Sequence, residues 1–212
     1  MAEEKRQPDS HWSVENVAVA LLAITAVLTA WSGFEASKWS GEMSISFSRA
    51  STQRIEAARA ATTAEAARAV DLQVFGIWLE ATAENDPRLE EFARERFTDH
   101  FAPAFDKWLA ARPLKNPDAP RSPFALEEYL PPGKAEAQEA DARADEYFAD
   151  ALADNRRGDN YTLLTVLFAL VLFFGALSGR FDSERRSWAL LGGAGVLLLV
   201  GIGLLIAFPK II

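Results

Sequence analysis

The chain alternates between long apolar runs and long charged segments. Three stretches of 18 residues or more contain no Asp, Glu, Lys or Arg: Asn16–Phe34, Asn160–Gly179 and Ser187–Pro209. A helix of roughly 20 apolar residues crosses the hydrocarbon core of a bilayer, which is about 30 Å thick. The rest of a 212-residue chain could hardly cover three such helices, so the pattern predicts three membrane spans.

Tryptophan positions bracket the first predicted span. Trp12 and Trp31 are separated by roughly 28 Å of helix, and tryptophan is enriched at the headgroup level of membranes. The sequence WSGFEASKWSGE (residues 31–42) repeats Trp-Ser-Gly where the apolar run ends, which indicates a membrane exit. No small-residue cleavage site follows the run, so we expect an uncleaved anchor. The residues expected at the membrane interface are Trp12, Trp31, Trp39 and Trp188.

The segment between the first two spans predicts a helical hairpin. Residues 44–85 contain no proline and a single glycine, and alanine recurs there at seven-residue spacing, as it does in residues 134–159. Small residues at this spacing let two helices pack closely. Alanine also has the highest helix propensity, so both segments are expected to be helical even if it was selected for that alone. The recurring alanines are Ala50, Ala57 and Ala64 in the first segment and Ala137, Ala144 and Ala151 in the second.

Further small residues indicate candidate contacts between helices. Ala57, Ala64 and Ala67 are expected to face the returning helix, whereas Ala61 continues the small residues onto the opposite side, where Lys and Glu would normally face solvent. Gly175 and Gly179 form a small-xxx-small pair in the second span, a spacing that lets membrane helices approach each other. These features predict a homo-oligomer.

Aromatic residues and prolines fill residues 86–133, the predicted tip of the hairpin. Asp86-Pro87 is a helix-start signal, with Asp as N-cap and Pro in the first turn. In the proline-rich segment Arg112–Gly133, Pro117, Pro120 and Pro123 recur at every third residue, the period of polyproline II. This segment is expected to be a strap across its own domain, with a ligand for another protein as the alternative. The expected tip core consists of Phe92, Phe97, Phe101, Phe105 and Trp108; the alternative is an exposed face for a protein partner.

Three stretches resemble a known family. AWSGFEASKWSGE, STQRIEAARA and FAPAFDKWLAARPLKNPDAPRSPF are similar to segments of an uncharacterised family of three-span bacterial inner-membrane proteins with an Ala-rich helical extramembrane domain. The resemblance extends over nearly the whole chain and implies a bacterial inner-membrane protein. It implies no activity, substrate or catalytic residue.

Charge and composition exclude several function classes. The net charge is −8, too acidic for a nucleic-acid-binding protein. The chain has no cysteine and two histidines, His11 and His100, which is too few for a typical zinc site. No phosphate-binding glycine loop or nucleophile motif is present. We therefore expect no enzyme activity, no metal and no cofactor.

The sequence thus predicts an all-α protein: three transmembrane helices with a long antiparallel helical hairpin and a small helical tip between the first two. Lys and Arg in the short segments favour a cytoplasmic N-terminus and place residues 36–159 outside the cytoplasm.

The expected function is that of an oligomeric interaction or scaffold protein; the alternative is a homo-oligomeric ion channel with threonine-lined spans and an acidic mouth. The segments are an N-terminal tail (1–13), span 1 (14–34), ascending helix (35–85), tip (86–133), returning helix (134–159), span 2 (160–179), cytoplasmic loop (180–186) and span 3 (187–209).

Overall fold

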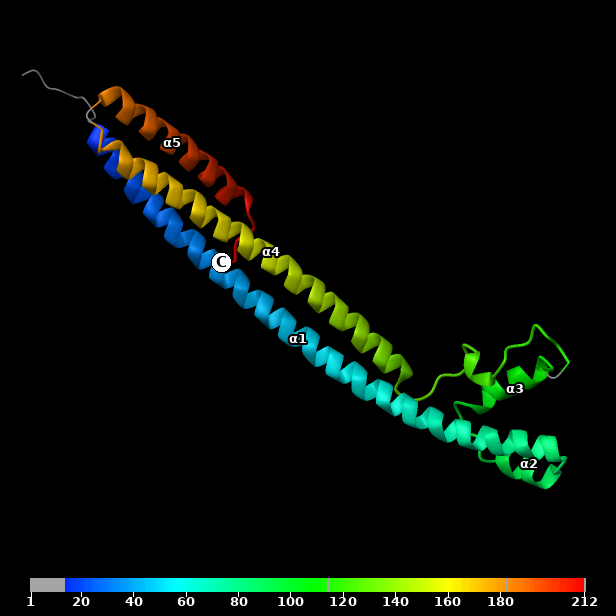
Figure 1. Cartoon of the computed structure of the whole chain (residues 1–212). Helices are drawn as coiled ribbons and strands as arrows, with labels where there is room; N and C mark the ends of the chain where they lie inside the picture. Colours follow the sequence, from blue (N-terminus) through cyan, green and yellow to red (C-terminus); the bar gives the residue numbers. More distant parts are fainter. Residues whose placement is uncertain (1–13, 114, 182, 212) are drawn as a thin grey trace, which may run out of the picture. The chain divides into compact units, whose positions relative to one another are not determined.

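The computed structural model describes residues 14–113, 115–181 and 183–211. These residues form helices and connecting turns without a strand, which confirms the all-α prediction. Three helices, α1, α4 and α5, are long and apolar enough to cross a membrane, as predicted. In chain order the elements are α1 (Val14–Glu84), α2 (Pro87–Arg94), α3 (Ala102–Ala110), the 3-10 helix η1 (Pro123–Ala125), α4 (Lys134–Ser178) and α5 (Glu184–Ala207), as shown in Figure 1.

The long helices run through the predicted segment boundaries. α1 has 71 residues and continues from the predicted first span into the ascending helix, while α4 has 45 residues and joins the returning helix to the second span. Neither contains proline, which would remove a backbone hydrogen bond and break the helix. α1 ends where Asn85 adopts a left-handed conformation with φ of 56°, a common way for a helix to terminate.

The predicted start of the tip is confirmed in detail. The Asp86 carboxylate accepts hydrogen bonds from the backbone N–H groups of Arg88 and Leu89, at 3.0 and 3.2 Å. Pro87 occupies the first turn of α2, where its missing N–H leaves no hydrogen bond unmade. The cap therefore restarts the chain as a helix directly after α1.

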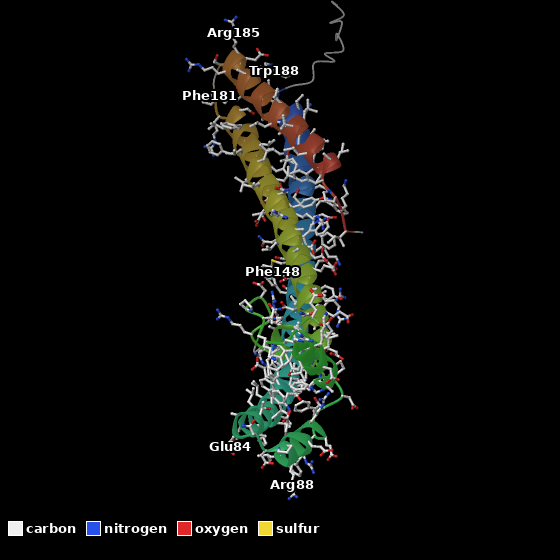
Figure 2. All side chains as sticks on the ribbon, turned by 90° about the vertical axis from the view of Figure 1, so that its right-hand side faces the viewer. Glu84, Arg88, Phe148, Phe181, Arg185 and Trp188 are labelled. Atoms are coloured by element: carbon white, nitrogen blue, oxygen red, sulfur yellow. The ribbon has the colours of Figure 1, made fainter. Side chains whose placement is uncertain are left out.

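The chain forms two compact units. The apolar unit comprises the described residues up to Ser46 together with those from Ala149 onward, and the hairpin unit comprises Phe47–Phe148. In the apolar unit α1, α4 and α5 lie side by side (Figure 1), around a core that includes Tyr161, Leu164 and Phe168. Figure 2 shows Phe181, Arg185 and Trp188 at the end of this unit where α4 connects to α5.

Two glycines of α4 lie against α1 inside the apolar unit. A Cβ atom at Gly158 would lie 3.6 Å from Trp39 of α1, and one at Gly175 would lie 3.1 Å from Leu22. The sequence order of these contacts is reversed between the two helices, so α1 and α4 run antiparallel. The absence of a side chain at Gly175 is what lets leucines of α1 pack against α4 there.

In the hairpin unit the same two helices pair again. Arg54 binds Asp145 at 2.6 Å and also Asp141, and Gln53 accepts a hydrogen bond from Arg143 at 3.0 Å. Phe47, earlier in α1, packs on Phe148, later in α4, with ring centroids 5.5 Å apart, so sequence order is again reversed across the pair. The recurring alanines lie between the helices: Ala50, Ala57, Ala140 and Ala144 are buried, and Ala60, Ala64, Ala67 and Ala137 are partly buried.

Candidate functional site

The tip of the hairpin unit is built around aromatic side chains. Phe101 and Phe105 are fully buried and pack against Phe75 and Trp78 of α1, with ring centroids 5.9 Å apart for Phe75–Phe101 and 4.8 Å for Trp78–Phe105. Most of these pairs meet edge to face, the favoured arrangement for aromatic rings. Trp108 is buried in the same cluster, and Phe97 is partly buried against it.

The prediction that Phe92 belongs to this core is wrong. Its side chain is 49% exposed, and the guanidinium of Arg96 lies over its ring at 3.4 Å. α2 has eight residues, and the face that it turns toward the core carries Ala93, which is buried. Successive residues of a helix point about 100° apart, so Phe92 cannot share that face.

The proline-rich segment contacts its own domain. The indole N–H of Trp108 donates to the carbonyl of Pro120 at 2.8 Å, Pro123 is buried, and Phe124 stacks on Phe101 with centroids 5.0 Å apart. These contacts match a strap across the tip, the first of the two interpretations of the sequence. The proline-rich segment therefore packs against buried side chains of the tip itself.

A buried carboxylate joins three segments of the tip. Asp71 of α1 is 1% exposed. Its Oδ1 accepts from the Thr98 hydroxyl at 2.6 Å, and its Oδ2 accepts from the Tyr129 hydroxyl at 2.8 Å and lies 2.8 Å from Nε2 of His100. Burial, together with the hydrogen bond to this carboxylate, raises the pKa of Tyr129 well above its usual range. The cluster holds the strap and the α2–α3 turn to α1.

Sequence reasoning missed Asp71, although a signal for it was present. Asp71 continues the seven-residue row of Ala50, Ala57 and Ala64, which is the buried row of α1. A charged residue in a core row is buried only when it is paired or fully hydrogen-bonded. The row therefore indicates a polar cluster at that level of the helix.

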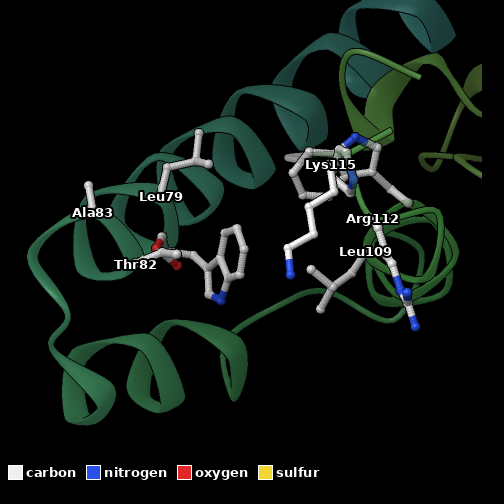
Figure 3. A pocket seen from close by; sticks show the side chains of 9 residues that line it. Leu79, Thr82, Ala83, Leu109, Arg112 and Lys115 are labelled. Carbon is white, nitrogen blue, oxygen red and sulfur yellow. The ribbon is translucent and has the colours of Figure 1, made fainter. Parts of the chain in front are cut away.

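A hollow lies beside the aromatic cluster, with a cavity volume of about 520 Å³. Figure 3 shows Leu79, Thr82 and Ala83 of α1 along one side and Leu109, Arg112 and Lys115 along the other. The two buried tryptophans of the cluster and Pro113 complete the lining. The walls are mainly apolar, and its cations belong to the segment that follows α3.

The apolar unit contains a second buried carboxylate, on Glu35. Its Oε2 accepts the backbone N–H of Ile211 at 3.1 Å, and its Oε1 has no hydrogen-bond partner. Ser32 and Trp39, on neighbouring turns of α1, also have buried polar atoms without partners. A buried ionisable group at a membrane span is costly and therefore points to function.

The predicted interface tryptophans differ in exposure. Trp31 and Trp188 are exposed, and Trp12 lies outside the described residues. Trp39 differs from them, because its side chain is 7% exposed, packs in the core of the apolar unit and is covered by Arg157 at 4.7 Å. The helical period turns Trp39 toward α4.

Of the remaining residues predicted to contact another helix, some do so within the chain and others do not. Gly175 packs against α1, but a Cβ atom at Gly179 would meet no atom of another helix within 4 Å. Ala61 is exposed. The span threonines donate to their own helices: the hydroxyls of Thr25 and Thr162 bond the carbonyls of Leu21 and Gly158.

In residues 14–113, 115–181 and 183–211, no three His, Asp or Glu side chains gather as metal ligands would. His100 and Thr98 direct their polar atoms toward Asp71.

Searches of the chain against protein-family models, curated proteins and solved structures give no match. The resemblance to a three-span bacterial family therefore stays a prediction.

Proposed function

We propose that this protein is a multi-pass membrane protein of the interaction type, whose hairpin unit lies outside the bilayer and assembles with further copies of itself. The three apolar helices support a bilayer environment. The observation that carries the proposal is the face of α1 that points away from α4 in the hairpin unit.

This outward face is almost uncharged. Over about six turns, nine of its ten exposed residues are uncharged, being small, apolar or neutral polar side chains, and the tenth is Arg59. Ile55, Val70 and Ile77 are exposed large apolar residues on it. A helix face in water normally carries charge, and exposed apolar stripes mark contact sites. The face consists of Ile55, Ala58, Arg59, Thr62, Ala66, Ala69, Val70, Gln73, Gly76 and Ile77.

We infer that this face binds the same face of a second copy of the chain. In a two-fold dimer the same patch meets itself, and a face of small neutral residues is complementary to its own copy. Small side chains also let two helix backbones approach closely. Arg59 is the charged residue within this face, and its long side chain lets the guanidinium reach water while the stem packs against apolar surface.

Placing a charge on the outward face tests the proposal. Ala66→Glu should weaken self-association at least tenfold, because assembly would bury a carboxylate without a partner. Ala142→Glu adds the same charge at an exposed position of α4 and should leave the assembly unchanged. Native mass measurement over a range of protein concentrations reports both. Full assembly of Ala66→Glu would show that the face is solvent-exposed, and the oligomer would then rest on the spans.

We further propose a bacterial inner-membrane location with the N-terminus in the cytoplasm and the hairpin unit outside it. Arg180, Arg185 and Arg186 lie at the α4–α5 connection, and positive charge in short loops favours the cytoplasmic side.

Because the chain has no native cysteine, Ser122→Cys and Ser183→Cys can be labelled separately with a membrane-impermeant thiol reagent on spheroplasts. Ser122→Cys should react and Ser183→Cys should not. The reverse pattern would place the tip in the cytoplasm.

Glu35 favours a second candidate function, an oligomeric ion or proton channel. Its buried carboxylate supplies an ionisable group close to a span, whereas the threonines bond their own helices. Planar-bilayer recording separates the two candidates, since a channel should conduct and lose or change conductance on Glu35→Gln. An interaction protein should show no conductance in either form.

A further inference from the structure

We propose that the hollow between α1 and the segment after α3 binds a small amphiphilic carboxylate, a molecule with an apolar body and one acidic group. This proposal is independent of self-association, because the hollow is lined by different residues from the outward face. It rests on the size of the hollow, its apolar walls and the cations at one side.

The hollow has the dimensions of a small-molecule site. Its volume of about 520 Å³ falls within the range of roughly 300–1,000 Å³ typical of ligand pockets, which are mostly apolar with a few placed polar groups. Trp78 and Trp108 line it with indole surface, while Leu79 and Leu109 remain 43% and 36% exposed. An apolar ligand body would cover these leucines and remove their surface from water.

The cations beside the hollow have no carboxylate partner. Arg112 and Lys115 form no ion pair with any described residue, in contrast to their neighbour Lys107, which binds Glu128. Arg112 and Lys115 are the two charged residues among the described residues that line the hollow, and no acid lines it, in a chain whose net charge is −8. The hollow is therefore a local basic region that favours an anion.

Backbone geometry fixes the position of these cations. Arg112 has φ of 53°, a left-handed conformation that residues other than Gly, Asn and Asp seldom adopt. Its N–H donates to the carbonyl of Leu109 at 3.0 Å, and its own carbonyl accepts from the N–H groups of Lys115 and Asn116, both at 2.9 Å. This turn brings Lys115 back beside Arg112 along one side of the hollow, as Figure 3 shows. Uncommon conformations held by such bonds tend to occur at ligand sites.

A carboxylate suits both cations. Guanidinium and ammonium groups donate charge-assisted hydrogen bonds to carboxylate oxygens, and an apolar body attached to the carboxylate can lie against the two indoles. The concave shape and limited volume favour a small molecule over a protein surface, which would need a larger and flatter contact. The ligand class that fits is an aromatic or branched aliphatic monocarboxylate.

The test is titration of 2-naphthoate into the full-length protein in lipid nanodiscs, followed by calorimetry, with empty nanodiscs as the blank. We expect saturable binding of one naphthoate per chain. The neutral analogue 2-naphthamide should bind at least tenfold more weakly, because it offers the same apolar body without the charge.

Three variants locate the binding. Lys115→Gln and Arg112→Asn should each weaken naphthoate binding about tenfold, and asparagine keeps the left-handed backbone of position 112. Arg121→Gln removes the same charge from a residue that does not line the hollow, so affinity should stay within twofold. Circular dichroism of each variant should match the parent protein, which separates loss of the cation from loss of the fold.

Several results would overturn the proposal. Absence of saturable naphthoate binding, equal affinity for 2-naphthamide, or unchanged affinity in both Lys115→Gln and Arg112→Asn would each show that no carboxylate site exists in the hollow. Tight binding of an acidic, leucine-containing peptide without naphthoate binding would assign the hollow to a protein partner instead.

Discussion

Phe101→Ala should destabilise the hairpin unit by about 3–5 kcal/mol, the range for removing a large buried aromatic side chain. Phe101 is fully buried and contacts the rings of Phe75, Phe97 and Phe124, so its removal leaves a cavity at the centre of the cluster. The rings around it belong to α1, to the α2–α3 turn and to the strap. Proteolysis in increasing urea, read at the strap region 112–121, measures the loss.

Phe92→Ala is the matched control for this prediction. The same side chain is removed from a position that is 49% exposed, where substitutions usually change stability by less than about 0.5 kcal/mol. The apolar unit should resist unfolding equally in both variants. Equal protease sensitivity of Phe101→Ala and the parent protein would contradict the described core and make the aromatics a binding surface.

Asp71→Ala should also cost about 3–5 kcal/mol, the range for removing one partner of a buried charged cluster. The substitution removes the carboxylate from the buried hydroxyl of Tyr129 and from the partly buried Thr98 hydroxyl and His100 Nε2. Because these groups belong to the α2–α3 turn and the strap, both should detach from α1. The urea–proteolysis measurement applies here as well, and Tyr129→Phe should lose about 1.5–3 kcal/mol through one missing charged hydrogen bond.

Asp106→Ala separates the effect of burial from the effect of charge. Asp106 binds Arg94 at 2.7 Å, but both side chains are more than half exposed. Exposed ion pairs contribute about 0–1 kcal/mol, so this variant should remain close to the parent protein. If Asp71→Ala and Asp106→Ala lose similar stability, the Asp71 cluster does not hold the tip together.

The long-range architecture could be predicted from local patterns. The uncharged runs predict the apolar helices, and the alanine row at Ala50, Ala57 and Ala64 predicts which face of α1 meets α4, because both follow from a helical period that holds along the whole element. Asp86-Pro87 marks the start of α2 through a local capping mechanism. Such features depend on neighbouring residues and need no knowledge of tertiary contacts.

The burial of individual side chains was harder to predict, both in the short tip and at single positions of the long helices. Phe92 and Phe101 are both phenylalanines of the tip, yet the orientation of an eight-residue helix exposes one while the cluster buries the other. Trp39 is eight residues from Trp31 and is buried, because the helical period turns it toward α4. The hollow depends on the left-handed turn at Arg112, for which the sequence contains no glycine as a signal.

Self-association can be measured by native mass spectrometry of the unmodified protein, extracted from its membrane in a mild detergent or in lipid nanodiscs. One chain has a mass of 23.3 kDa. We predict particles that contain two or more chains and dissociate on dilution, with the Ala66→Glu variant dissociating at a higher concentration. Particles of a single chain at every concentration, with the variant behaving identically, would show that the protein does not self-associate.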